Sequence, residues 1–117
     1  MTAFRGKKEE ITIKPTSYNL TQRCQELLLE LNIIYREKQA EYKLDITEDI
    51  IINVDPLYFE MALRNLLDNA FKYSSSPAKL TVAIMRKRKK IYICITDYGK
   101  GIPKKEQKKI FREFLPF

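Results

Sequence analysis

The stretch Met61-Ala-Leu-Arg-Asn65-Leu-Leu-Asp-Asn69-Ala-Phe-Lys72-Tyr73 decides the fold of this chain. Apolar residues recur in it at helical spacing, so it is predicted to form a helix with one buried stripe. Asn65, Asn69, Lys72 and Tyr73 stand at positions i, i+4, i+7 and i+8, and they therefore share one face of that helix. Two amides, one cation and one aromatic ring thus project in a row from a rigid element.

These side-chain types suit a nucleotide that is bound through a hard metal ion. An amide oxygen ligates Mg²⁺ without the repulsion that a carboxylate exerts on a triphosphate. A lysine meets a phosphate as a point charge, and a tyrosine offers a flat surface to a base. A polar residue on the flank of a helix is most often only solvated, so the helix by itself is a weak signal.

A second motif, Asp97-Tyr-Gly99-Lys-Gly101-Ile102-Pro, follows a strongly alternating apolar strand. An aspartate at a strand end can accept a hydrogen bond from an exocyclic amine, and glycines let the backbone approach a flat ring or adopt φ > 0. Two glycines spaced in this way after an aspartate usually form only a turn. The preceding helix with its two asparagines, and a β-hairpin between the two motifs, make the combination specific.

On these motifs the chain resembles the catalytic ATP-binding domain of sensor histidine kinases, in the GHKL superfamily (Bergerat fold) of topoisomerase II, Hsp90 and MutL ATPases. Residues 65–74 are similar to the family's N box, residues 97–103 to its G1 box and residues 110–114 to its F box. The resemblance extends from about residue 10 onward. It implies an α/β (α+β) two-layer sandwich, with helices packed on one face of a mixed β-sheet.

The resemblance also implies ATP and Mg²⁺ as cofactors and a role for each matching position. These roles are Mg²⁺ ligation by Asn69 with help from Asn65, phosphate contact by Lys72, base or ribose contact by Tyr73, adenine recognition by Asp97, and pocket shape by Gly99, Gly101 and Ile102. Guanine presents a carbonyl where adenine has its amine, so the aspartate would select adenine. A structural alternative stays open for two positions: Tyr73 in the core, and Asp97 as a cap of the next turn. Asp68 is expected to be solvated.

Asn65 also bears on the type of reaction. The ATP-hydrolysing relatives have a glutamate there, four residues before the metal-binding asparagine, as the general base for water. An asparagine favours phosphoryl transfer to a side chain over hydrolysis. The chain contains no histidine, so the resemblance places the phospho-accepting histidine and its dimerisation domain on another segment or chain. That domain and, indirectly, a response regulator are the implied partners in two-component signal transduction.

Family members continue past the F box through an ATP lid, a second glycine-rich box and two more strands. The sequence is therefore expected to be a truncated domain that retains the adenine and Mg²⁺ half of the pocket and is catalytically incomplete alone. Its expected location is cytoplasmic, including the cytoplasmic side of an inner-membrane receptor. Two alternatives are an anti-sigma-factor-type serine kinase of the same superfamily and a basic interaction module that binds no nucleotide.

Length and charge fit one globular domain. The 117 residues divide into a predicted linker at 1–9 and the partial domain at 10–117. The net charge of +7 is concentrated at residues 86–90 and 104–109, which we interpret as a hairpin turn and a solvated helix face rather than a specific nucleic-acid surface. Cys24 and Cys94 have no metal-binding spacing and are expected to be small buried residues in a reducing compartment.

Periodicity predicts the remaining elements. They are an edge strand at 11–14, a helix capped by Ser17 or Asn19 and running to about Ala40, short strands at 44–46 and 50–54, the helix that opens at Asp55-Pro56, a hairpin of strands 80–85 and 91–96, and a short helix from Pro103 to about Phe111. The strand at 91–96 would then have an open edge, which predicts possible self-association.

Overall fold

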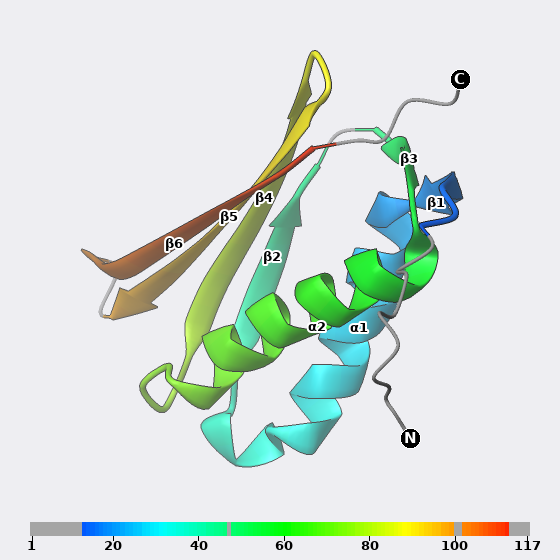
Figure 1. Ribbon diagram of the computed structural model, residues 1–117. Helices are drawn as coiled ribbons and strands as arrows, with labels where there is room; N and C mark the ends of the chain where they lie inside the picture. The colour runs from blue at the N-terminus through cyan, green and yellow to red at the C-terminus, as the bar shows by residue number, and fades with distance from the viewer. Residues whose placement is uncertain (1–12, 47, 100–101, 113–117) are drawn as a thin grey trace, which may run out of the picture.

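Two helices cover one face of a four-stranded mixed sheet in the computed structural model, which describes residues 13–46, 48–99 and 102–112 (Figure 1). In chain order the elements are β1 (Thr16–Asn19), α1 (Leu20–Ile34), the short 3₁₀ helix η1 (Arg36–Lys38), β2 (Glu41–Asp45), β3 (Ile51–Val54), α2 (Pro56–Lys72), β4 (Lys79–Lys87), β5 (Lys90–Gly99) and β6 (Ile102–Arg112). The predicted two-layer α+β architecture is confirmed.

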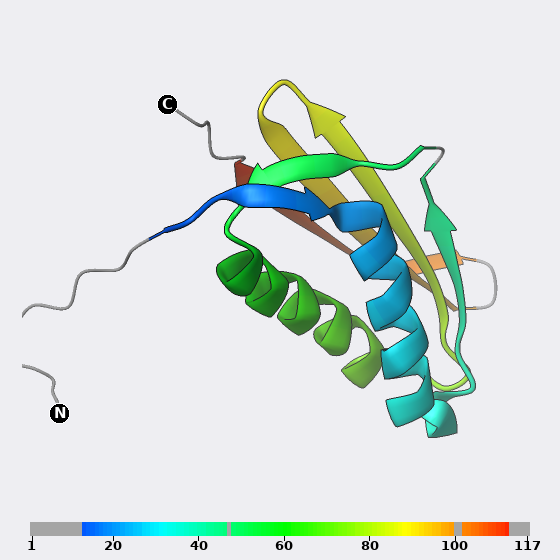
Figure 2. The ribbon, with the colours of Figure 1, turned by 90° about the vertical axis from the view of Figure 1, so that its right-hand side faces the viewer.

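The main sheet has the strand order β2-β4-β5-β6. Its β2–β4 pair is parallel, whereas the β4–β5 and β5–β6 pairs are antiparallel. Strands β1 and β3 form a separate antiparallel ribbon, which Figure 2 shows at one end of the helix layer. The sheet thus presents one face to both helices.

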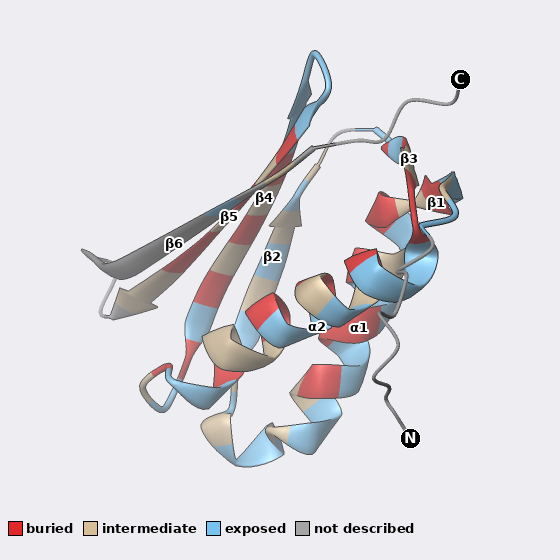
Figure 3. Cartoon of the chain, viewed as in Figure 1, coloured by how far each residue is buried: buried red, intermediate tan, exposed pale blue. Residues whose placement is uncertain are grey.

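The core lies between that face and the helices. Alternate residues of the hairpin are buried, and Figure 3 shows them as stripes across the two strands. They are Leu80, Val82 and Ile84 in β4 and Ile91, Ile93 and Ile95 in β5. Helix α2 contributes Phe59, Leu63, Leu66, Leu67 and Phe71 to the same core. The predicted hairpin and the predicted apolar stripe of α2 are both confirmed.

A side-chain oxygen caps the amino terminus of each of the two helices. Asn19 Oδ1 accepts a hydrogen bond from the backbone N–H of Gln22 at 3.0 Å, so Asn19 rather than Ser17 caps α1. Asp55 Oδ1 accepts from the N–H of Leu57 at 3.0 Å, and a proline occupies the first turn of α2 as predicted. The other Asp55 oxygen accepts from the N–H of Lys14, and this bond is the main cause of a lowered pKa of the Asp55 carboxyl.

Two predicted boundaries are wrong. Helix α1 ends at Ile34 and not near Ala40, because Tyr35 leaves helical geometry and the chain then turns through Gln39 at φ 50° into β2. The first strand is β1, not residues 11–14. Of that range, 11 and 12 lie outside the described residues, and Ile13 and Lys14 are not in a strand.

The predicted short helix from Pro103 to Phe111 is also wrong, because this segment is the strand β6. It pairs with β5 from the Gly99–Ile102 pair to the Lys90–Arg112 pair. The lysine-rich sequence favours a helix locally, but the unpaired N–H and C=O groups of β5 offer a ladder that overrides this preference. The edge at 91–96 is therefore covered, and the prediction of an open edge there is wrong.

Neither Cys24 nor Cys94 forms a disulfide within the described residues. Cys24 is fully buried, and burial raises the pKa of its thiol to about 12. Cys94 is only half-buried, in contrast to the prediction. No helix within the described ranges is long and apolar enough to cross a lipid bilayer.

A polar cluster joins β1, α1 and α2. Glu60 of α2 accepts hydrogen bonds from the hydroxyl of Tyr18 at 2.6 Å and from Nε of Arg23 at 2.9 Å, and a second Arg23 nitrogen bonds its other oxygen. These bonds, above all those from Arg23, hold the pKa of the Glu60 carboxyl below its ordinary value. Burial and the nearby carboxylate raise the pKa of Tyr18. Arg23 of α1 thus makes a bidentate contact with Glu60 of α2, and this contact holds the two helices together.

We expect Glu60→Gln to reduce the dependence of stability on acid pH. A carboxyl whose folded pKa is depressed stabilises the fold above its unfolded pKa of about 4.5, and this stabilisation is lost as the pH falls through the folded value. At pH 7 the variant should be about 1 kcal/mol less stable. The difference in the free energy of unfolding between the variant and wild type should become smaller as the pH approaches about 3.

The measurement is urea unfolding from pH 7 to pH 3. Glu41→Gln, at an exposed position of β2, is the matched control and should follow the wild-type profile. A constant difference between Glu60→Gln and wild type across this range would show that the carboxylate charge is irrelevant.

Candidate functional site

A small pocket lies where the carboxyl-terminal half of α2 meets the end of β5. Its volume is about 20 Å³, roughly the space of one water molecule. The lining residues come from α2, β4 and β5 and from the chain just after α2, and they are Asn69, Ala70, Tyr73, Ser74, Leu80, Ile95 and Asp97. Three of the residues predicted from the two sequence motifs therefore meet at one place.

Asp97 stands in the wall of this pocket. It pairs with Leu80 of β4 and lies opposite Lys105 in the register of β6, next to a bulge between Asp97 and Tyr98. Its Oδ1 atom is buried and has no hydrogen-bond donor among the described residues. A buried carboxylate oxygen without a donor is costly, so this atom is poised to accept a hydrogen bond from a bound group.

The end of α2 provides the opposite wall. Asn69 is half-buried, and Tyr73 is 64% exposed, so the alternative that Tyr73 belongs to the core is wrong. Lys72 Nζ lies 5.4 Å from the centroid of the Tyr73 ring, within the range of a cation–π contact. An aromatic ring and an amide therefore line the pocket together with Asp97, and the ammonium group of Lys72 lies over that ring.

Other predicted site residues lie around this pocket rather than in it. Asn65 is exposed and borders an open depression on the outer side of α2 with Tyr58 and Met61. Gly99 and Ile102 pair with each other where β5 leads into β6. Gly101 lies outside the described residues. The structure thus separates the two asparagines by one helical turn, with only Asn69 at the pocket.

Two residues that the sequence motifs did not single out hold the end of α2 in place. Lys38 Nζ donates hydrogen bonds to the carbonyls of Lys72 at 3.2 Å and Ser74 at 2.7 Å. Ser74 is itself buried, and its hydroxyl donates to the carbonyl of Phe71 at 2.9 Å. Ser74 belongs to the stretch similar to the N box, but no local signal marks Lys38, because its contacts lie over thirty residues away.

The carboxylates of α2 point away from the pocket. Asp68, expected to be solvated, instead accepts a hydrogen bond from the Tyr35 hydroxyl at 2.9 Å. Glu60 is bound by Arg23. Because both acids are held by groups at or next to α1, the side of α2 near the pocket presents the uncharged amide of Asn69, with the ammonium of Lys72 over the neighbouring Tyr73 ring. This arrangement favours an anionic ligand.

The sequence comparison identifies the family. Residues 54–116 match the family described as histidine kinase-, DNA gyrase B- and HSP90-like ATPase. The chain belongs to this family, and its fold is that of a GHKL ATP-binding domain of the sensor histidine kinase type.

Individual relatives agree with this assignment. The adaptive-response sensory kinase SasA of Synechococcus sp. (strain JA-3-3Ab) is 33% identical over 115 residues, which cover 97% of this chain and 30% of that protein. The chain spans less than a third of the length of the curated relatives it matches.

Solved structures share the fold. The nucleotide-free catalytic domain of histidine kinase ThkA superposes with a TM-score of 0.62 at 20% identity, covering 78% of this chain and 60% of that chain. ThkA in complex with the response regulator protein TrrA gives a TM-score of 0.64 at 19% identity, covering 79% of this chain and 28% of that chain.

We expect Lys38→Met to destabilise the domain and loosen the end of α2. The variant keeps an unbranched stem but loses the ammonium that bonds two carbonyls at the helix terminus, where a positive charge is favourable. The loss should be about 1 kcal/mol in the free energy of unfolding. Hydrogen exchange should accelerate at residues 69–74.

Lys43→Met, at an exposed position of β2, is the matched control and should leave both quantities unchanged. If Lys38→Met resembled this control in stability and exchange, the two hydrogen bonds from Lys38 would have no part in fixing the pocket.

Proposed function

We propose that this chain binds Mg²⁺ and ATP between α2 and the end of β5, as the nucleotide-binding part of a sensor histidine kinase. The observation that carries the proposal is the buried Oδ1 of Asp97, which faces a small pocket and has no donor within the described residues. Adenine recognition supplies that donor through the exocyclic amine, and guanine does not.

Asn69 is the proposed Mg²⁺ ligand. Mg²⁺ is commonly held by one or two protein oxygens together with phosphate oxygens and water, and the half-buried amide at the pocket suits such a shared site. Asn65, one turn earlier on α2, assists directly or through water. Neutral ligands leave the charge of the ion to the phosphates, so nucleotide and metal bind together.

The other predicted residues complete the proposed site. Lys72 contacts a phosphate, and Tyr73 lies along the purine or ribose, for which its exposed ring beside Lys72 is suited. Gly99 and Gly101 shape the pocket, and Ile102 lines it. These roles come from the resemblance to the N and G1 boxes.

The proposed reaction is phosphoryl transfer to a histidine on another segment or chain. The chain has no histidine of its own, and Asn65 supplies no general base for water. A histidine-containing dimerisation domain is therefore the direct partner. A response regulator is the indirect one, as supported by the solved complex of ThkA with TrrA. A serine acceptor would instead favour the anti-sigma-factor type of kinase.

We expect Asp97→Asn to weaken adenine-nucleotide binding by about tenfold, because the amide replaces a charge-assisted hydrogen bond by a neutral one. The melting temperature without nucleotide should stay near that of wild type, because the Oδ1 atom has no donor in the described part of the protein. Affinity is measured by NMR titration with ADP and Mg²⁺, in which wild-type amide shifts should map to residues 65–73 and 95–98.

Asp45→Asn removes the same charge from an exposed position at the end of β2 and serves as the matched control. It should bind ADP like wild type. A large fall in melting temperature for Asp97→Asn would mark the residue as structural, and wild-type shifts confined to residues 86–90 would indicate mere attraction of anions to the hairpin.

We expect Asn69→Ala to abolish the contribution of Mg²⁺ to binding. In wild type, removal of Mg²⁺ with EDTA should lower the affinity for ATP, whereas in the variant the affinity should already be low and insensitive to EDTA. Adenosine affinity should change little, because its contact is with Asp97. An ATP affinity that still depends on Mg²⁺ to the wild-type extent would remove Asn69 from the metal site.

A further inference from the structure

Helix α2 runs along the β5–β6 pair from one end to the other. At one end the rings of Phe59 and Phe111 lie 4.9 Å apart, with Ala62 in the same cavity wall. At the other end Asn69 and Asp97 line the nucleotide pocket. Helix α2 is therefore held against β6 at one end, and at the other end it borders a pocket with β5.

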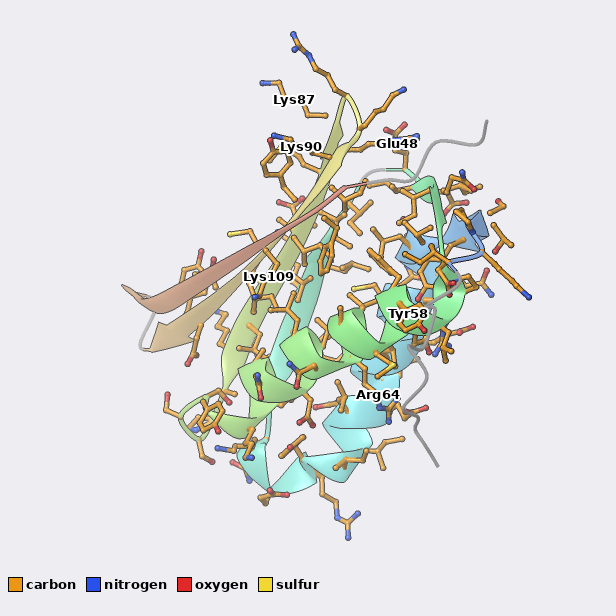
Figure 4. The ribbon with its side chains drawn as sticks, viewed as in Figure 1. Glu48, Tyr58, Arg64, Lys87, Lys90 and Lys109 are labelled. Carbon is orange, nitrogen blue, oxygen red and sulfur yellow. The ribbon has the colours of Figure 1, made fainter. Side chains whose placement is uncertain are left out.

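Lys109 lies on the side of β6 that faces α2. It pairs with Ile93, a fully buried core residue, and side chains of paired residues share one face of a sheet. It is also two residues from Phe111, which packs on the core. Figure 4 shows Lys109 on the same side of β6 as α2. Unlike its buried partner Ile93, Lys109 is exposed.

The register gives the distance of Lys109 from the proposed adenine contact. Lys105 is opposite Asp97, and Lys109 is four residues further along β6, a span of about 13 Å. An extended nucleoside triphosphate bridges such a span, whereas a nucleoside does not. The direction is from Asn69 toward the amino terminus of α2, where Phe59 meets Phe111, the residue two positions beyond Lys109.

The charge of Lys109 is available to a ligand. It forms no ion pair with a carboxylate in the described part of the chain. The α2 residues toward this space, such as Ala62 and Asn69, are uncharged, and Glu60 and Asp68 are bound by residues at or next to α1. An anion between α2 and β6 would therefore meet the ammonium group of Lys109, while the Glu60 and Asp68 carboxylates are engaged by residues at or next to α1.

We propose that Lys109 binds the distal phosphate of the nucleotide and so favours ATP over ADP and adenosine. This proposal rests on the proposed function, because it assumes adenine at Asp97 and the phosphates running along α2. Strand β6 then takes part in binding, because it places the ammonium group of Lys109 at the end of the site farthest from Asp97. Lys72 and Lys109 then contact the phosphate chain from α2 and from β6.

The test compares wild type, Lys109→Gln and Lys87→Gln by isothermal titration with ATP, ADP and adenosine, each with Mg²⁺. Lys87 is an exposed lysine of β4, shown near the tip of the hairpin in Figure 4, and its substitution removes the same charge. Lys109→Gln should weaken ATP binding about fivefold, ADP less and adenosine not at all. Lys109→Arg should retain ATP affinity near wild type, and Lys87→Gln should have little effect on any ligand.

Two failures are distinguishable. If Lys109→Gln weakened ATP no more than Lys87→Gln, while wild type still bound adenosine and ATP through Asp97, the role of Lys109 would be overturned and the proposed function would stand. If wild type bound none of the three ligands in a manner sensitive to Asp97→Asn, both proposals would fall. Equal melting temperatures of the lysine variants without nucleotide show that the comparison concerns binding and not folding.

Discussion

The packing of α2 against the β4–β5 hairpin is the constraint on which the site depends. Leu63, Leu67 and Phe71 are fully buried between helix and sheet, and Phe71 is stacked on Tyr35 at 6.0 Å and meets Tyr42 edge-on. These contacts fix both the rotation and the height of the helix over the strands. Rotation by one residue would carry Asn69 away from Asp97, so a core interaction determines whether the two motifs meet.

The two long sides of α2 differ in their polar contacts. Arg23 and Tyr35 bind the carboxylates of Glu60 and Asp68 and thereby use the acidic groups of the helix to hold the helix layer together. Arg64 pairs with Glu30 of α1 in the same way. The side toward β5 and β6 carries the amide of Asn69, small residues and apolar contacts. The net positive charge of the chain therefore acts on the site without compensation from α2 itself.

The sequence was sufficient for the parts of the fold that rest on local signals. The helix cap at Asp55-Pro56, the hairpin and the stripe of α2 follow from propensity and period, and the structure has them where predicted. The meeting of Asn69, Tyr73 and Asp97 at one pocket was implied by resemblance. Periodicity alone gives no distance between an α2 residue and a β5 residue.

The errors occur where tertiary contacts override local preference. Residues 103–111 contain good helix formers, yet pairing with β5 makes them a strand. Asp68 looks like a surface acid in sequence, but a tyrosine hydroxyl more than thirty residues away binds it. Lys38 has no neighbour in sequence that predicts its bonds to the end of α2. Each of these features requires knowledge of which distant segments lie side by side.

Burial divides the proposed site into two parts that respond differently to the solvent. The Asp97 oxygen is buried, so its hydrogen bond to a base is shielded from water and from dissolved ions. Lys72 and Lys109 are exposed, so their attraction to phosphates is screened at ionic strengths where the Debye length falls below about 10 Å. In the proposed site, the choice of base would depend on the adenine amine meeting the buried Asp97 carboxylate oxygen, and the gain from each added phosphate would depend on exposed lysines. Affinity for adenosine should consequently vary little with salt, while the advantage of ATP over adenosine should shrink as salt rises. This difference in salt dependence follows from the exposure of the two lysines. If their charges lay inside the pocket, they would have to be desolvated even in the absence of a ligand.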